Sequence, residues 1–358
     1  MKKFRNIAIG LVVIMTTVIV TVCTYYNINM TAVSKDTTLK EVTIEEGTIE
    51  SIGVTLKENN LIKNVTIFKV YTRLTDRTNL KAGIYNLSED MGVEEIVTIL
   101  EEGSTVNPDE ISITFKEGIN IRKIATLISE NTNNSYDDVI KLMNNDEYIN
   151  SLIDKYWFLT DDIKNKDIYY PLEGYLFPNT YRFTNKDVSI EDIFTKMLDE
   201  TERQLADYKD EINKSGLSIH ELITLSSIVE LEGATANDRA KVAGIFYNRL
   251  NSSSYPTLGS DATTYYGSKI DDWTVSLTYD ELDDCSNKYN TRCSSNTGLP
   301  VGPICNPSIE SIEATINPED NDYYYFVADC NGKVYLTKKP SEHNNIINKL
   351  KSEYNWCA

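Results

Sequence analysis

The chain has 358 residues, with 54 acidic and 35 basic side chains and a formal net charge of −19. Apart from the N-terminal tail it has no basic cluster, which excludes the positive footprint that nucleic-acid binding needs. Its only two histidines, His220 and His343, exclude a His-rich metal site, and a Ser-His-Asp triad would have to use one of them. No phosphate loop or dinucleotide glycine pattern is present, so we predict no cofactor and no metal.

The N-terminus has the pattern of a membrane anchor. Residues 7–23 form an almost unbroken apolar run, preceded by Lys2, Lys3 and Arg5. The run is long enough to span a bilayer, and the positive-inside rule places the N-terminus in the cytoplasm. A cleaved signal peptide is the alternative, but no A-x-A pattern of small residues follows the run. We expect a cytoplasmic tail (1–6), an uncleaved transmembrane anchor (7–26), a stalk (27–40) and an extracytoplasmic remainder of the chain.

Residues 41–160 are predicted to form a small α+β module. Segments 42–62 and 113–131 each show a short alternating strand, a Glu-Gly turn and an amphipathic helix, and 80–103 repeats the strand–turn–helix order. A further helix is expected over 136–153. Each strand–helix piece resembles the LysM type of glycan-binding repeat. The alternative, a packing module without a sugar site, remains open.

Residues 161–358 are predicted to form a second α+β domain, after a charged, turn-rich segment at 160–168. Ser218 and Glu221 have the spacing of a capping box and open a helix that ends near Gly233. Another helix is expected over 237–250. Near the end, Asn331-Gly332 between two apolar strands predicts a terminal β-hairpin with a type I′ turn.

Five cysteines follow the anchor, and none has the spacing of a zinc site. An extracytoplasmic location permits disulfides, and the pairs Cys285–Cys293 and Cys305–Cys330 are both reasonable. The fifth is Cys357, so an odd number leaves at least one unpaired. Connectivity cannot be read from the sequence, and unpaired thiols in a reducing habitat are the equal alternative.

Glu230 is the strongest candidate for a catalytic group. It lies in the last turn of the 218–233 helix, where the negative end of the helix dipole favours a protonated carboxyl, as a general acid requires. Ser226 and Ser227 share its side of the helix and would leave room for a ligand. The alternative is a solvated surface glutamate. Glu232 points elsewhere and is the weaker candidate.

Three tyrosine-bearing loops supply candidate substrate-binding residues. Aromatic faces beside amides and hydroxyls suit sugar rings, which combine apolar C–H faces with hydroxyl rims. Any single tyrosine can equally be a packing residue, because the chain contains 23 of them. The residues that we select from these loops are Glu173, Tyr175, Ser260, Asp261, Tyr289 and Asn290.

Four ordered segments of the second domain carry a family resemblance: LEGYLFPNTYRF (172–183), SSIVELEG with AKVAGIFYNRL (226–250), TLGSDATTYYG (257–267) and YNTRCSSNTGLPVGPICNP (289–307). Together with the repeat module and the anchor, they resemble the MltG/YceG-like endolytic murein transglycosylases. The resemblance implies lytic cleavage of the MurNAc–GlcNAc β-1,4 bond of nascent peptidoglycan strands, forming 1,6-anhydroMurNAc ends and terminating strand elongation. It identifies Glu230 as the catalytic glutamate of the S-I-V-E motif. Penicillin-binding proteins or other wall synthases are the implied partners.

One carboxyl is enough for this lytic reaction, because no water has to be activated as the nucleophile. Asp261 would be the second carboxylate of a hydrolase, and we expect it to have a substrate-binding or structural role. Leu231 and Ala262 depart from the lysine and the proline usual in the family, which leaves loop shape and substrate preference open. A non-catalytic peptidoglycan-binding or scaffolding protein is the alternative function. A pyridoxal-phosphate lyase would be cytosolic, and the anchor argues against it.

Overall fold

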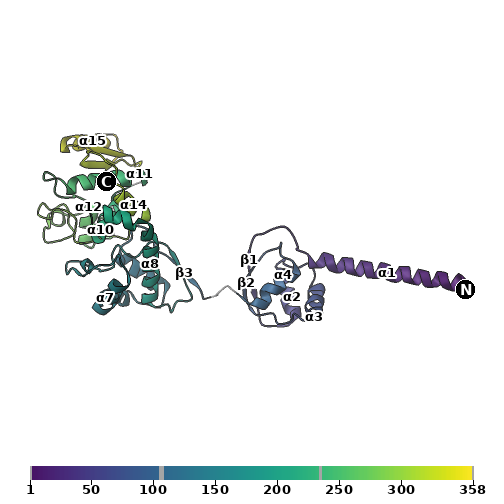
Figure 1. Cartoon of the computed structure of the whole chain (residues 1–358). Helices are drawn as coiled ribbons and strands as arrows, with labels where there is room; N and C mark the ends of the chain where they lie inside the picture. The colour runs from purple at the N-terminus through teal and green to yellow at the C-terminus, as the bar shows by residue number, and fades with distance from the viewer. Residues whose placement is uncertain (1, 105–108, 234–235, 357–358) are drawn as a thin grey trace. The chain divides into compact units, whose positions relative to one another are not determined.

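The structure, a computed structural model, describes residues 2–104, 109–233 and 236–356 (Figure 1). The chain is a mixed α+β protein that divides into two compact units, Met1–Glu110 and Ile111–Ala358. The sequence pattern instead predicts a boundary after residue 160. The difference arises because β3 (Ile111–Thr114) pairs antiparallel with β4 (Thr180–Phe183), which ties the segment from residue 111 onward to the second unit.

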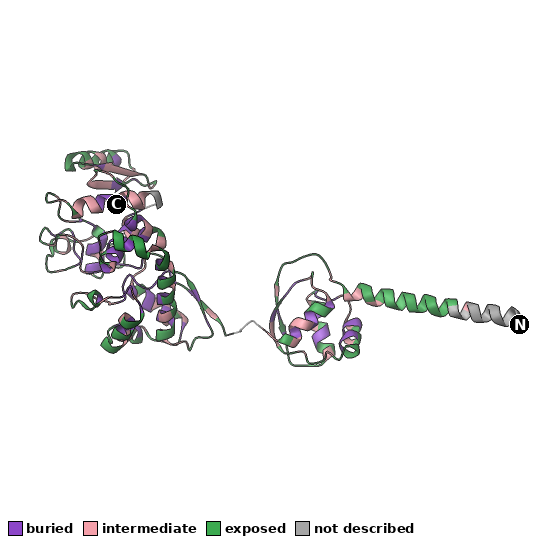
Figure 2. Ribbon diagram, in the orientation of Figure 1, coloured by how far each residue is buried: buried purple, intermediate pink, exposed green. Residues whose placement is uncertain are grey.

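Helix α1 (Lys2–Met30) is a candidate membrane span by its length and composition. Its window Val13–Met30 has a mean hydropathy of 1.3. The apolar side chains between Val13 and Ile28 are exposed, as Figure 2 shows. The helix ends at Met30, so it includes the first four residues of the predicted stalk. In the described structure its apolar side chains are not covered by other parts of the protein, as they would be in a core helix.

The first unit surrounds a two-stranded sheet with short helices. Val42 of the first strand faces Tyr85 of the second in antiparallel register. Both strand–turn–helix units predicted at 42–62 and 80–103 are present, and their buried residues form one apolar core. In chain order the elements are β1 (Lys40–Ile44), α2 (Ile49–Glu58), α3 (Val65–Leu74), β2 (Gly83–Leu87) and α4 (Val93–Glu102).

The second unit is mainly helical, with two further antiparallel strand pairs. Besides β3 and β4 its elements are α5 (Ile121–Asn131), α6 (Tyr136–Met143), α7 (Asp146–Lys155), η1 (Asp161–Lys164), α8 (Ile190–Leu205), η2 (Ala206–Tyr208), α9 (Lys209–Lys214), α10 (Ile219–Glu232), α11 (Ala236–Leu250), α12 (Asp261–Gly267), α13 (Tyr279–Asp283), α14 (Ile309–Ile316), β5 (Tyr325–Ala328), β6 (Val334–Thr337) and α15 (Pro340–Ser352).

Helix α10 joins the two apolar cores of this unit. Leu222 and Ile223 pack into the core formed by α5 to α8. Leu225 and Ile228 pack into the core formed with α11 and α12. The predicted capping box is confirmed, because Ser218 accepts from the backbone N–H of Glu221 while the Glu221 side chain accepts from the backbone N–H of Ser218. A helix held on both sides in this way places its last turn rigidly.

Two predicted elements differ from the structure. The single helix expected over 136–153 is broken into α6 and α7, because the Asn145 side chain accepts from the Tyr148 N–H and starts a new helix. The terminal hairpin is present, with Val327 opposite Tyr335. Its turn is not type I′, which needs two residues with positive φ, because only Gly332 (φ 77°) has one.

One predicted disulfide is confirmed and the other is wrong. Cys285 is bonded to Cys293 across a separation of eight residues. Cys305 is a free, buried thiol, so it does not pair with Cys330. Its sulfur instead donates to the carbonyl oxygen of Ser227 at 3.3 Å. Cys357 lies outside the described residues.

Candidate active site

Glu230 occupies the last turn of α10, where the helix emerges from the core. Every residue from Leu222 to Val229 is buried, whereas Glu230 keeps 6% of its side chain exposed. Ser226 and Ser227 are fully buried and do not leave the open space expected from the sequence. Ser227 accepts at Oγ from the backbone N–H of Ile304 at 3.0 Å, so the small serine side chains admit a neighbouring loop.

Four donors surround the Glu230 carboxyl group. Oε2 accepts from the backbone N–H of Ser308 at 2.9 Å, from the Ser308 hydroxyl, and from the Ser311 hydroxyl at 2.7 Å. Oε1 accepts from Nη2 of Arg239 at 3.0 Å. Because Ser308 is the N-cap of α14, Glu230 also faces the positive end of that helix dipole. All four groups donate to the carboxyl oxygens and so fix the orientation of the Glu230 side chain.

A glycine turn passes over Glu230. Gly118 has φ +74°, and a Cβ atom at that position would lie 3.7 Å from Cγ of Glu230 and 3.4 Å from Cδ2 of Leu231. The turn is fixed by Asn306, whose carbonyl accepts from the N–H of Gly118 at 2.9 Å and whose own N–H donates to the carbonyl of Ile119 at 2.9 Å. The loop after β3 is thus bound to the loop that precedes α14.

Glu117 brings a second carboxylate close to Glu230. Burial, together with the charges of Glu230 and Glu310, raises the pKa of Glu117, and Arg239 opposes that rise. Sequence reasoning missed Glu117, Ser308 and Arg239. The only local signal is the Glu-Gly turn at 117–118, which the repeat pattern accounts for equally well.

Glu173 is buried and accepts hydrogen bonds from three donors, each on a different segment of the chain. Its donors are the N–H of Ile121 (3.0 Å), the Tyr266 hydroxyl (2.9 Å) and Nδ2 of Asn306 (3.2 Å). Burial raises the pKa of its carboxyl group from 4.5 to about 7. In this position the side chain holds together the loops beside Glu230 and does not face open space.

Three more of the predicted substrate-binding residues have fully buried side chains. Tyr175 hydrogen-bonds through its hydroxyl to Nδ1 of His220 at 2.9 Å. Tyr289 packs against Tyr266 with ring centroids 4.8 Å apart. Asn290 accepts from the Thr264 hydroxyl at 3.0 Å and donates to the carbonyls that end α13. All three fix the shapes of loops in the described structure.

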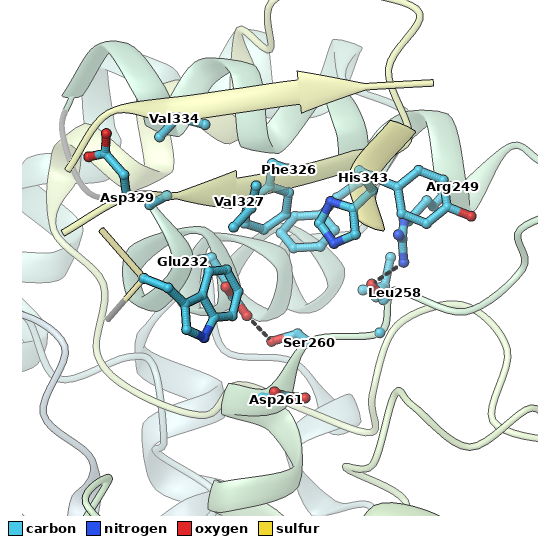
Figure 3. A pocket seen from close by; sticks show the side chains of 15 residues that line it. Glu232, Arg249, Leu258, Ser260, Asp261, Phe326, Val327, Asp329, Val334 and His343 are labelled. Carbon is cyan, nitrogen blue, oxygen red and sulfur yellow. Dashed lines mark hydrogen bonds between the residues drawn. The ribbon is translucent and has the colours of Figure 1, made fainter. Parts of the chain in front are cut away.

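Ser260 and Asp261, in contrast, line a cavity of about 420 Å³ against the β5–β6 hairpin (Figure 3). Ser260 donates to Oε1 of Glu232 at 2.6 Å, and Asp261 pairs with Arg292 at 2.5 Å. Burial raises the pKa of the Glu232 carboxyl group, and the Ser260 hydroxyl opposes that rise. Glu232 therefore faces this cavity and not the groups that bind Glu230, as its position on the helix predicts.

Among residues 2–104, 109–233 and 236–356, no group of three or more His, Cys, Asp or Glu side chains is arranged to hold a metal ion. The carboxyl group of Glu230, between hydroxyl and guanidinium neighbours, can take part in proton transfer. Serine hydroxyls can both donate and accept, so Ser308 and Ser311 can hold Glu230 in either protonation state.

Comparison with known proteins identifies the family. The model of the YceG-like family matches residues 42–349. The endolytic murein transglycosylase of Bacillus subtilis (strain 168) is 36% identical over 327 residues, which cover 90% of this chain and 88% of the relative. A protein with the same name from Streptococcus pneumoniae serotype 2 (strain D39 / NCTC 7466) is 33% identical, over 88% of this chain and 59% of its own length.

A solved structure agrees with these matches. The crystal structure of a putative YceG-like protein from Listeria monocytogenes superposes with a TM-score of 0.60 at 39% sequence identity. The match covers 86% of this chain and 99% of that chain. On the extent of the family match and the identity to these relatives, the chain belongs to the YceG-like family.

Proposed function

We propose that this protein is an endolytic lytic transglycosylase that cuts peptidoglycan strands, with Glu230 as the catalytic acid and base. The observation that carries the proposal is the carboxyl group of Glu230, which is fixed by four hydrogen bonds at the emerging end of a core helix. The names of the relatives from Bacillus subtilis and Streptococcus pneumoniae supply the substrate, murein.

In the first step, protonated Glu230 donates its proton to O4 of GlcNAc while the bond from C1 of MurNAc to that oxygen breaks. The carboxylate formed in this step then accepts the proton of the C6 hydroxyl of the same MurNAc. That oxygen bonds to C1 and closes a 1,6-anhydro ring. No water is consumed, so one carboxyl group performs both proton transfers.

The neighbours of Glu230 suit the state between these two transfers. Arg239 and the N–H of Ser308 donate to the carboxylate, and both would stabilise it until the second proton arrives. The hydroxyls of Ser308 and Ser311 can turn to accept from the protonated form. The arrangement therefore supports a residue that alternates between acid and base.

The four buried residues selected from the loops are proposed to fix the shape of the site without contacting the strand. Glu173 holds the loops beside Glu230 through Ile121 and Asn306. Tyr175 fixes the start of α10 through His220, while Tyr289 and Asn290 fix the region of α12 and α13. Ser260 and Asp261 lie in the neighbouring cavity and are proposed to contact the strand there.

The remaining parts of the chain fit a protein that acts at the wall. We propose that α1 anchors it in the cell membrane with its N-terminus in the cytoplasm, because the basic residues precede the apolar window.

The first unit, with its strand–helix pieces, would hold the glycan as LysM-type repeats do. A wall synthase that makes nascent strands is the proposed partner. Protease treatment of intact spheroplasts tests the proposed orientation of α1, because it should digest the second unit and spare the N-terminal tail.

Mass spectrometry of glycan products tests the reaction. Purified full-length protein should release strands with 1,6-anhydroMurNAc ends, and Glu230→Gln should reduce the rate by about 100-fold to 10,000-fold, the usual contribution of a general acid–base group. Glu221→Gln is the matched control, because it alters a carboxyl group on the same helix and glutamine can keep the bond to the Ser218 N–H. Full activity in Glu230→Gln would refute the assignment of the acid. Intact strands bound to wild-type protein would instead favour the non-catalytic alternative.

A further inference from the structure

Two adjoining cavities begin at the glycine turn that covers Glu230. The larger measures about 480 Å³ and the smaller about 90 Å³. Gly118, Asn120, Asp271 and Trp273 line both of them. Because Gly118 lies against the Glu230 side chain, this groove starts beside the proposed catalytic group.

Trp273 and Tyr265 form a flat aromatic platform in the groove. Their rings stack with centroids 5.3 Å apart and an angle of 8° between the planes. Tyr265 is fixed from below, because its hydroxyl donates to the carbonyl of Val275 at 2.8 Å. Half of the Trp273 surface remains exposed. An indole supported on one side and exposed on the other is a preformed surface for a flat apolar ligand face.

A charged group with an unused donor lies next to the platform. Arg122 donates from Nε and Nη2 to the two carboxylate oxygens of Asp271, at 2.9 and 2.6 Å, and Asn120 donates to the same carboxylate at 2.7 Å. Nη1 of Arg122 is buried and has no hydrogen-bond partner among the described residues. A buried guanidinium N–H without an acceptor is energetically costly, so this atom is ready to bind an acceptor from a ligand.

We propose that this groove is a saccharide subsite in which one pyranose ring of the glycan strand stacks on Trp273 while Nη1 of Arg122 donates to a hydroxyl or N-acetyl oxygen. The inference rests on the proposed function and names the part of the chain that holds the strand beside Glu230. A pyranose ring has an apolar C–H face that suits the indole and a polar rim that suits the arginine.

The groove has one ion pair, Arg122–Asp271, and one further lining cation, Lys123, so its charge suits a sugar strand better than a dense polyanion. Asp271 neutralises Arg122 through a two-point ion pair, so the pair offers a donor without a net positive charge. The whole chain is strongly acidic as well, which disfavours polyanions such as nucleic acids or phosphate-rich wall polymers. The ring that binds Trp273 is therefore an amino sugar of the strand.

Calorimetric binding of peptide-free GlcNAc–MurNAc oligosaccharides to full-length protein in detergent tests the subsite. The Glu230→Gln background prevents cutting during the measurement. Trp273→Ala should raise Kd about ten-fold, because it removes the aromatic face on which the sugar ring stacks. Trp273→Phe keeps a flat ring and should change Kd less than about three-fold. Tyr279→Ala is the matched control, because Tyr279 is exposed in the following segment and lines neither cavity.

Two further variants keep the test decisive. If Trp273→Ala does not fold, Trp273→Leu preserves an apolar contact with Tyr265 but removes the flat face, and the same rise in Kd is expected. Arg122→Lys keeps the charge but removes the forked donor, and should weaken binding several-fold. Unchanged Kd in folded Trp273→Ala or Trp273→Leu protein overturns the subsite, even if Glu230→Gln is inactive.

Failure of the proposed function gives a different result. If Glu230→Gln still cuts strands, the acid has been assigned wrongly, and the subsite is then judged from the kinetics of cutting. Trp273→Ala in otherwise unaltered protein should raise KM about ten-fold and leave kcat within about two-fold, since the platform binds the strand and supplies no group to the reaction. A fall in kcat at constant KM would contradict a binding subsite.

Discussion

Ser308 caps helix α14 and binds Glu230 at the same time. Its Oγ accepts from the N–H of Ser311 at 3.3 Å, while its own N–H donates to Oε2 of Glu230 at 2.9 Å. The start of α14 and the end of α10 are therefore joined through one carboxyl group. A substitution at either helix end should therefore change the rate of the reaction that Glu230 is proposed to catalyse.

Ser311→Ala should lower kcat about ten-fold, because it removes a 2.7 Å hydrogen bond to a charged group and leaves the Ser308 cap in place. Thr315→Ala is the control in the same helix, since the Thr315 hydroxyl donates to the carbonyl of Ser311 and does not bind Glu230. Initial rates of strand cutting should separate the two variants. Equal losses would show that α14 acts through its stability alone.

Gly118→Ala should lose activity as well as stability. The positive φ of Gly118 disfavours alanine by about 1 kcal/mol, and relief of that strain would move the turn that lies against Glu230. Gly216→Ala carries the same backbone strain at φ +80°, but its Cβ atom would meet no atom of the described residues within 4 Å. Thermal unfolding should therefore show similar losses, with reduced cutting in Gly118→Ala alone. Loss of cutting in both variants would argue against a specific role for the turn.

The sequence predicted the helix that bears Glu230 because its signals are local. Ser218 and Glu221 lie three residues apart, and their capping box needs no tertiary contact. The partners of Glu230 could not be predicted in the same way. Ser308 is 78 residues away from Glu230 in sequence, and nothing in its local pattern distinguishes it from the other serines of the chain.

The polar residues of the loops were harder to interpret than the helices. Glu173 lies beside a glycine in a tyrosine-rich loop, which is typical of a binding residue, but it accepts from the backbone N–H of Ile121 inside the core. Sequence alone does not distinguish a loop carboxylate that binds a buried N–H from one that faces a ligand. Ser226 and Ser227 present the same ambiguity, since small polar residues suit both an open site and close packing.

Cys305 should resist alkylation until the protein unfolds. Burial, together with the charges of Glu230 and Glu173, raises the pKa of this thiol well above its ordinary value, so almost no thiolate is present near neutral pH. Peptide mass spectrometry after iodoacetamide treatment should find Cys305 unmodified in the native protein. The same residue should be fully modified in guanidinium chloride, which serves as the internal control. Rapid labelling of the native protein would mean that the loop over Ser227 opens readily.

Glu173 should make the protein less stable as the pH rises from about 4.5 to about 7. Its pKa is about 7 in the folded state and close to 4.5 when the chain is unfolded. Between these values the unfolded chain releases the proton while the folded chain keeps it, so unfolding becomes easier with rising pH. The raised pKa corresponds to about 3 kcal/mol, which is lost progressively across this window and not recovered above it.

Glu173→Gln removes the titrating group and should remove this part of the pH dependence. Relative to the wild type, the free energy of unfolding of the variant should increase by about 3 kcal/mol between pH 4.5 and pH 8, whatever the constant cost of the amide. Denaturant titrations in detergent at four or five pH values would measure the difference. Parallel curves for the two proteins would show that Glu173 ionises in the folded chain as easily as in the unfolded one. The hydrogen bonds from Ile121, Tyr266 and Asn306 would then stabilise the buried carboxylate as well as water does, and burial alone would not set its pKa.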